Sequence, residues 1–178
     1  MRVLTVRQPW AWAIIHGGKT VENRTRNLAG SYRGPVAIHA GLAYDEDAVI
    51  WTGPVPTPLA IDEDGSHREP RGHIIGVVDL VDVHAALDCM TQEHDGDWKV
   101  CSEWSERSGY HLVLANPRAL DEPLPWKGGL GLRRLPLSVH GDALIGPVDG
   151  CTCGAGRISY QHEPMCGFEL VAHLRATA

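Results

Sequence analysis

The chain has 178 residues, is 43% hydrophobic and carries a formal net charge of −6. This length suits one domain with a small appendage, and it is long enough to bury a hydrophobic core. Its apolar runs fall short of the roughly 18 residues that a membrane-spanning helix needs, and its start lacks the charged and apolar regions of a secretory signal. We therefore expect a cytoplasmic protein with no membrane partner.

The segment from residue 3 to residue 24 contains the clearest succession of local signals. A β-branched, apolar start predicts a strand over 2 to 6. Pro9 stands where the first turn of a helix tolerates a missing N–H, and apolar residues follow it at helical spacing. Gly17 and Gly18 then stop the helix after about two turns. The segment therefore predicts a strand, a short helix and a turn.

A strand is also predicted over 19 to 24, and it carries Lys19, Glu22 and Arg24. The two-residue period of a strand places Glu22 and Arg24 on one face, and Lys19 joins them if it lies in the preceding turn. A desolvated lysine can act as a base or nucleophile, a carboxylate can shuttle a proton, and an arginine can clamp an anion. We expect Lys19 and Glu22 as catalytic residues if the protein is an enzyme. The alternative is a surface ion pair that stabilises little.

The remaining pattern is typical of a β-rich α+β protein. The near-continuous β-branched run at 73 to 84 suits a long, bent, central strand. Residues 43 to 51 suit a short helix, and the proline-rich segment 52 to 71 suits a long exposed loop. Further strands are predicted at 35 to 39, 110 to 116 and 130 to 135.

Charge is distributed unevenly along the chain. Residues 1 to 41 contain six Lys or Arg and one acid, whereas residues 42 to 109 contain four Lys or Arg and fifteen acids. A polyanion would therefore meet the first segment, together with Lys127 and nearby arginines. The acidic middle either keeps the protein soluble or contacts a protein partner.

One tryptophan and one histidine add candidates for ligand contacts. Trp12 is one residue off the apolar stripe of the predicted helix, so we expect it to stack on a base while Trp10 packs in the core. His39 follows an apolar run, where it either faces the cleft or simply ends a strand.

The tail contains a possible set of metal ligands among glycines that permit tight turns. Three thiolates and one imidazole within sixteen positions would suit a structural Zn²⁺ ion; the alternative is a set of reduced cysteines. The ligand set is Cys151, Cys153, His162 and Cys166. The chain's five cysteines are an odd set, which argues against a secreted disulfide framework.

Four blocks of the sequence resemble the ASCH domain family, which is grouped with the PUA-like β-barrels. The blocks are QPWAWAIIHGGKTVENR at 8 to 24, RGPVAIHAG at 33 to 41, GHIIGVVDLVDVH at 72 to 84 and HLVLANPRALDEPLPWKGGLGLRRLP at 111 to 136. They are most similar to the cointegrator-type ASCH domain. The resemblance implies a small PUA-like barrel over residues 1 to 137 with short flanking helices, followed by a Cys/Gly-rich extension over 138 to 178.

The family's Gly-x-Lys-x-x-Glu-x-Arg motif falls on Gly17, Lys19, Glu22 and Arg24, and the resemblance implies that it lines a cleft. Bacterial relatives that deacetylate an acetylated cytidine are similar at Lys19 and Arg24 but carry Thr in place of Glu22. Other relatives are metal-assisted ribonucleases, which would require a divalent metal. The cointegrator-type domain is mainly a nucleic-acid binder.

We therefore expect a protein that binds RNA, single-stranded nucleic acid or a modified nucleoside in a basic cleft. Lys19, Arg24 and Arg26 would contact phosphate or a base edge, Glu22 would accept a hydrogen bond or act as a base, and Trp12 would stack. His39 and Lys127 would contribute from neighbouring segments. The alternatives are a hydrolase, either a ribonuclease or a nucleoside amidohydrolase, and a protein-interaction module.

Overall fold

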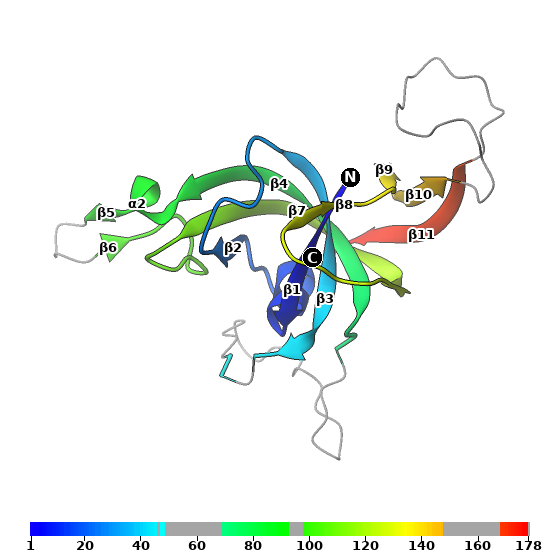
Figure 1. Ribbon diagram of the computed structural model, residues 1–178, viewed down its shortest axis with the longest axis horizontal. Helices are drawn as coiled ribbons and strands as arrows, with labels where there is room; N and C mark the ends of the chain where they lie inside the picture. Colours follow the sequence, from blue (N-terminus) through cyan, green and yellow to red (C-terminus); the bar gives the residue numbers. More distant parts are fainter. Residues whose placement is uncertain (46, 49–68, 93–97, 148–167, 178) are drawn as a thin grey trace.

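The computed structural model of the protein describes residues 1–45, 47–48, 69–92, 98–147 and 168–177 (Figure 1). Strands dominate these residues. The first half contains β1 Arg2–Gln8, α1 Trp10–His16, β2 Val21–Arg24, β3 Gly34–Tyr44, β4 His73–Ala85 and α2 Ala86–Cys89. The second half contains β5 Thr91–Gln92, β6 Trp98–Lys99, β7 Tyr110–Pro125, β8 Leu132–Arg134, β9 Ser138–His140, β10 Ala143–Pro147 and β11 Phe168–Ala176.

The predicted strands and the helix after Pro9 are confirmed, and Gly17 caps that helix as expected. Several strands extend further than predicted, and β7 continues to Pro125. Residues 43 and 44 of the predicted short helix belong instead to β3, because that strand continues past its apolar stretch to Tyr44. Most of the predicted loop at 52 to 71 lies outside the described residues.

One large sheet has the strand order β8-β1-β3-β4-β7-β11-β10-β9, and β2 pairs with β7 beside this path. The β-rich fold with few short helices agrees with the predicted small PUA-like domain. The predicted barrel was wrong in one respect, because β8 and β9 at the two ends of the described sheet do not pair and the sheet is not closed. Pro136 lies between these strands and has no N–H to donate, and the β1–β8 ladder ends at Arg134. The chain then pairs β9 with β10.

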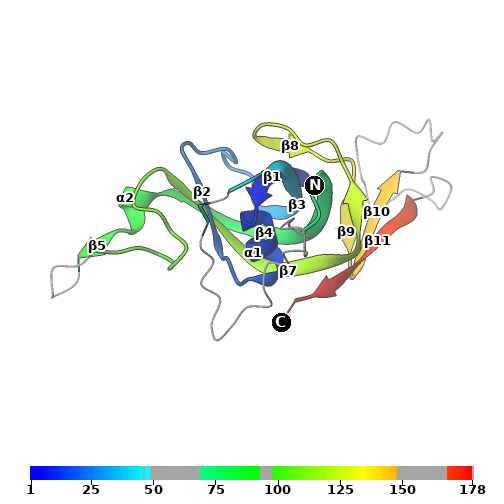
Figure 2. The same ribbon diagram turned by 90° about the horizontal axis from the view of Figure 1, so that it is seen from below.

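The first hydrophobic core lies between α1 and the strands that curve around it (Figure 2). Ala11, Ile14 and Ile15 of α1 are buried there. Gly76 of β4 permits this close approach, because a Cβ atom at that position would lie 2.7 Å from the Ile15 Cδ1 atom. The short helix is therefore held by tertiary packing, which a two-turn helix requires.

The second hydrophobic core joins the start of the chain to its last strands. Val3, Ile74, Leu144 and Leu174 all belong to it. Through the pairing of β11 with β7, strands β9, β10 and β11 continue the same sheet. The expected boundary at residue 137 therefore falls between two strands of one sheet.

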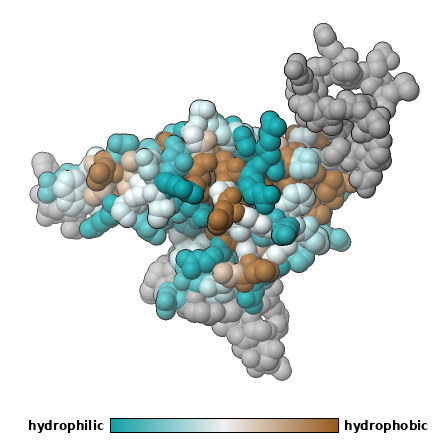
Figure 3. Space-filling model, viewed as in Figure 1, coloured by the Kyte–Doolittle hydropathy of each residue, from teal (hydrophilic) through white to brown (hydrophobic). Residues whose placement is uncertain are grey.

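None of the described helices combines the length and apolar character that a membrane span needs. On the face shown in Figure 3, hydrophobic and hydrophilic residues are interspersed over the central strands.

Candidate functional site

A cavity of about 660 Å³ opens beside α1, β1 and β2. The turn after α1 positions its first polar residue: Gly18 adopts a φ of 70°, and the Lys19 amide donates to the Ala13 carbonyl. The lining residues are Thr5, Val6, Arg7, Trp10, Lys19, Glu22, Asn23, Arg24, Asp45, Glu103, Trp104, Ser105 and Glu106. Most of the lining thus comes from two parts of the chain, the segment from 5 to 24 and the loop at 103 to 106, which we treat as the two walls of the cavity.

Lys19 is buried in this cavity, with only 5% of its surface exposed. Its Nζ atom donates to the Val21 carbonyl at 2.5 Å and lies 5.5 Å from the centre of the Trp10 ring and 5.6 Å from that of Trp104. These distances suit cation–π contacts. Burial lowers the pKa of Lys19 below its ordinary value, although the nearby Glu22 carboxylate opposes the shift.

Glu22 and Arg24 share one face of β2, as the strand period predicted. One Glu22 oxygen lies 3.0 Å from the Arg24 guanidinium, and the other lies 3.8 Å from the Lys19 Nζ atom. Lys19 precedes β2, so it joins these two residues from the turn. Burial raises the pKa of Glu22, and the charges of Arg24 and Lys19 partly offset this shift. The three charges form one connected ion-pair group.

The backbone of β1 holds the Arg24 side chain in place. Its guanidinium donates to the Thr5 carbonyl at 2.8 Å. Its Nε atom is buried and has no hydrogen-bond partner among the described residues. A buried N–H without a partner is costly, and a bound ligand can satisfy it.

The far wall of the cavity is the loop after Cys101, which the sequence reasoning did not assign to the site. Asn23 holds this loop: its amide donates to the Trp104 carbonyl at 2.8 Å, and its oxygen accepts from the Glu106 amide at 3.0 Å. Local pattern carries no signal for this contact, because 81 positions separate Asn23 from Trp104.

The cavity lining is mixed in charge. Three of its residues are cations, Arg7, Lys19 and Arg24, and four are acids, Glu22, Asp45, Glu103 and Glu106. The other basic residues of the first segment lie elsewhere. Arg2 lies over the Tyr32 ring, Arg33 pairs with Asp82, and Arg26 is exposed outside the lining. The lining therefore differs from the basic cleft that the chain's first segment suggested.

Trp10, which we expected in the core, both packs against the first core and lines the cavity. Trp12 is not among the lining residues and lies against His16, with 5.6 Å between the ring centroids. His39 is buried in β3 with its Nε2 atom 2.9 Å from the Trp126 carbonyl, away from the cavity. The structure thus brings Lys19, Glu22 and Arg24 together without Trp12, Arg26 or His39.

Lys127 lies in a second hollow of about 290 Å³. Its lining has three cations and no acid, and consists of Val3, Pro125, Trp126, Lys127, Arg133 and Arg134. Both hollows border β1, since Val3 lines the second and Thr5 lines the first. The second hollow is therefore basic, although none of its three cations belongs to the first segment at 1 to 41.

The proposed zinc ligands of the tail, Cys151, Cys153, His162 and Cys166, lie outside the described residues. Among the described residues, a different group could hold a metal ion: His84, Cys89, Cys101 and His111. We refer to these four residues as the Cys₂His₂ cluster. Sequence spacing gave little sign of it, because none of its neighbouring ligands forms a short Cys-x-x-Cys or His-x₃-His pair.

Comparison with protein families adds one finding. The family model described as "ASCH domain" matches residues 4–124, which is more than half of the chain. The matched region contains the cavity, both walls and the Cys₂His₂ cluster. The chain belongs to the ASCH domain family.

Proposed function

We propose that this protein binds RNA by enclosing one nucleobase, or a modified nucleoside, in the cavity around Lys19. Membership of the ASCH family indicates a nucleic-acid-binding or RNA-related module of the PUA-like kind. Within the family we place the chain with the cointegrator-type domains, on the blocks at 8 to 24 and 72 to 84. The observation that carries the proposal is the pair of tryptophan rings, Trp10 and Trp104, whose centres lie 5.5 Å and 5.6 Å from the buried ammonium group of Lys19.

The chemistry of the lining favours a base over a run of phosphates. Aromatic faces contribute stacking, which every base can use. Glu22 can accept a hydrogen bond from an exocyclic amine, while the partly exposed Arg24 guanidinium can donate to a carbonyl or ring nitrogen. The four acids of the lining would repel several closely spaced phosphates. A volume of about 660 Å³ falls within the range of small-molecule sites.

The phosphate backbone would leave the cavity along β1 and reach the second hollow. Lys127, Arg133 and Arg134 supply the positive charge of that hollow. Phosphate contacts are sequence-independent and sensitive to salt, whereas base contacts specify. The proposal therefore assigns recognition to the cavity and electrostatic attraction to the second hollow.

The test is fluorescence anisotropy with labelled single-stranded oligoribonucleotides, followed by competition with free nucleosides and their acylated forms. Trp104→Ala should weaken binding by about 10- to 100-fold, which corresponds to the loss of one stacked base. Replacing Arg133 and Arg134 by Ala should weaken binding less at high salt than at low salt. Arg107→Ala is the matched control for Trp104→Ala. Arg107 is an exposed cation in the loop that carries Trp104, but it does not line the cavity.

Unchanged affinity in Trp104→Ala, with weakened affinity in the double arginine variant, would contradict base enclosure. It would leave a surface that binds nucleic acid only by charge. Capture of a protein partner that depends on residues 44 to 107 but survives loss of Lys19 and Arg24 would instead favour the protein-interaction alternative.

One observation favours a second candidate, a hydrolase acting on an acylated nucleoside. Burial lowers the pKa of Lys19, and a neutral amine beside a carboxylate can accept a proton from an attacking water. Incubation with acylated nucleosides and single-stranded RNA, followed by chromatography, tests this candidate. Turnover in the wild type that disappears in Lys19→Met, while the variant still binds, would establish catalysis.

A further inference from the structure

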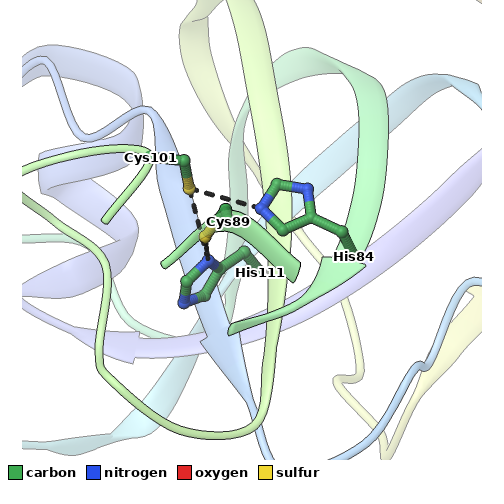
Figure 4. A group of neighbouring side chains, drawn as sticks. All are labelled: His84, Cys89, Cys101 and His111. Carbon is green, nitrogen blue, oxygen red and sulfur yellow. Dashed lines mark hydrogen bonds between the residues drawn. The ribbon is translucent and has the colours of Figure 1, made fainter. Parts of the chain in front are cut away.

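The four side chains of the Cys₂His₂ cluster point toward one another from different elements (Figure 4). His84 lies near the end of β4, Cys89 ends α2, Cys101 follows β6, and His111 lies near the start of β7. One donor atom from each residue lies within 4.8 Å of the other three. The group lies in the matched family region and is separate from the lining of the cavity.

The backbone brings these residues together through two pairings. His84 and His111 are direct partners in the β4–β7 ladder, so their side chains emerge side by side. The β5–β6 hairpin pairs Thr91 with Lys99, which returns the chain beside its starting point. Cys89 lies two residues before that pair and Cys101 two residues after it. One thiol therefore lies on each side of the base of the hairpin, Cys89 before β5 and Cys101 after β6.

The contact distances suit a shared metal ion. The Cys101 Sγ atom lies 3.3 Å from the His84 Nε2 atom and 3.3 Å from the His111 Nδ1 atom. The Cys89 Sγ atom lies 3.4 Å from the same His111 Nδ1 atom. Sulfur and nitrogen ligands on a tetrahedral zinc ion lie about 3.5 Å apart, given ordinary Zn–S and Zn–N bond lengths. The observed separations are close to the edges of such a tetrahedron.

The second nitrogen of each histidine is already fixed by an acceptor. The His84 Nδ1–H group donates to the Asp82 carboxylate at 2.8 Å, and the His111 Nε2–H group donates to the Glu106 carbonyl at 2.7 Å. A carbonyl oxygen can only accept, so the His111 Nδ1 atom keeps its lone pair and faces the thiols. Metal-bound histidines typically donate their other N–H to a carboxylate or carbonyl in this way.

We propose that His84, Cys89, Cys101 and His111 bind one structural Zn²⁺ ion. Two thiolates and two neutral imidazoles fill a tetrahedral shell and leave no position for substrate. The two thiolates also balance the charge of the ion. A Cys89–Cys101 disulfide would satisfy neither imidazole, so it explains the arrangement less well.

The zinc ion would also support the cavity. Cys101 begins the loop that carries Trp104 and Glu106, and the His111 Nε2–H group holds that loop by donating to the Glu106 carbonyl. Metal bound at Cys101 and His111 would hold this loop at both of its ends. Its removal should therefore loosen the wall of the cavity that faces Lys19.

The experiment measures zinc by mass spectrometry in full-length protein purified without chelator, in three forms. The wild type is compared with Cys89→Ser/Cys101→Ser and with Cys151→Ser/Cys153→Ser/Cys166→Ser, which removes the thiols of the tail. The tail variant should retain about one zinc ion per chain, and the cluster variant should lose one relative to the wild type. A folded tail variant without zinc would overturn the proposal.

Because the cluster variant can fail to fold, a second measurement uses the tail variant alone. Dialysis against a chelator and then Co²⁺ should produce the absorption bands of tetrahedral cobalt with thiolate ligands. Intact mass after alkylation should show both Cys89 and Cys101 as reduced thiols. Absence of these cobalt bands, or a Cys89–Cys101 disulfide in place of the metal, would overturn the proposal.

Discussion

The cavity and the Cys₂His₂ cluster both gather polar side chains, yet they satisfy them differently. In the cavity, Lys19 and Glu22 are buried, Arg24 is partly exposed, and the single Glu22 carboxylate pairs with both cations at 3.0 to 3.8 Å. In the cluster, two imidazoles and two thiols converge with lone pairs that face inward. The ion pairs of the cavity involve only charges that the protein itself supplies. The metal-ligand atoms of the cluster converge on a point where a bound cation would satisfy them.

This difference suggests different roles for the two regions. The cavity retains one buried unpartnered donor and open volume, which are properties of a site that exchanges ligands. The cluster offers four ligands and belongs to the projecting region of the molecule formed by α2, β5 and β6 (Figure 1). We infer that the cavity recognises a ligand and that the cluster stabilises the structure around it.

The largest expected effect on the free energy of unfolding is at Gly109, where the cavity and the cluster regions meet. Its φ is 80°, and a Cβ atom there would lie 2.4 Å from the Arg24 carbonyl, while its own carbonyl accepts from Ala86 of α2. Gly109→Ala should lower the free energy of unfolding by about 3 kcal/mol, from backbone strain and overpacking together. Urea denaturation measures this change.

Gly18→Ala is the control for Gly109→Ala, because Gly18 also has a positive φ, of 70°, but open space around it. It should cost only about 1 kcal/mol, from backbone strain alone. Equal losses in the two variants would show that Gly109 does not couple the cavity to the cluster.

A smaller loss is expected when the charge balance of the cavity is broken. Glu22→Gln leaves the buried Lys19 and the partly exposed Arg24 without their shared counter-charge, so it should lower the free energy of unfolding by about 2 kcal/mol. Lys19→Met should cost less, under about 1 kcal/mol, because Glu22 keeps its contact with Arg24. The reverse order, measured by urea denaturation, would contradict the view of Glu22 as the shared counter-charge.

A pH dependence of stability should follow from Lys19. Its pKa is lowered by burial, so between that lowered value and the ordinary 10.5 the unfolded chain binds a proton that the folded chain has released. The free energy of unfolding of the wild type, minus that of Lys19→Met, should therefore rise with pH across this window. Denaturation curves collected from about pH 7 to about pH 10 test the sign, and a falling difference would contradict it.

The smallest expected effect on stability is at Asp82, beside the cluster. Asp82 is half exposed and pairs with Arg33 at 3.4 Å, so Asp82→Asn should change the stability of the metal-free protein by less than about 0.5 kcal/mol. It should nevertheless weaken zinc binding by about tenfold or more, because Asp82 orients His84. Competition with a chromophoric chelator measures that affinity.

Asp79→Asn is the matched control for Asp82→Asn. Asp79 is also a β4 carboxylate, but it pairs with Arg118 rather than with a histidine of the cluster. It should leave zinc affinity unchanged. An equal loss of affinity in both variants would mean that Asp82 acts by general charge rather than through His84.

The features that could be predicted from sequence depend on residues close together along the chain. Pro9 and Gly17 bound α1, and the two-residue period of β2 places Glu22 and Arg24 on one face. These features are set by backbone geometry over a few residues, so a single sequence suffices. The Lys19 group was therefore anticipated almost completely.

The features that escaped prediction depend on strand pairing. Asn23 reaches Trp104 only because β2 pairs with the start of β7, and His84 meets His111 only through the β4–β7 register. That ladder contains three irregularities between His84 and His73, which no local pattern reveals. The open sheet was missed for the same reason, since closure depends on partners of β8 and β9.

Residues 110 to 113 of β7 are bonded on both sides. They pair with β2, which carries Glu22, and with β4, which approaches His84. Each of these amides points to one of the two neighbouring strands and is protected by that ladder, so the segment lies in a region that we expect to open late. In heavy water, these four amides should be among the slowest to exchange, and their exchange rates would then report the free energy of global unfolding.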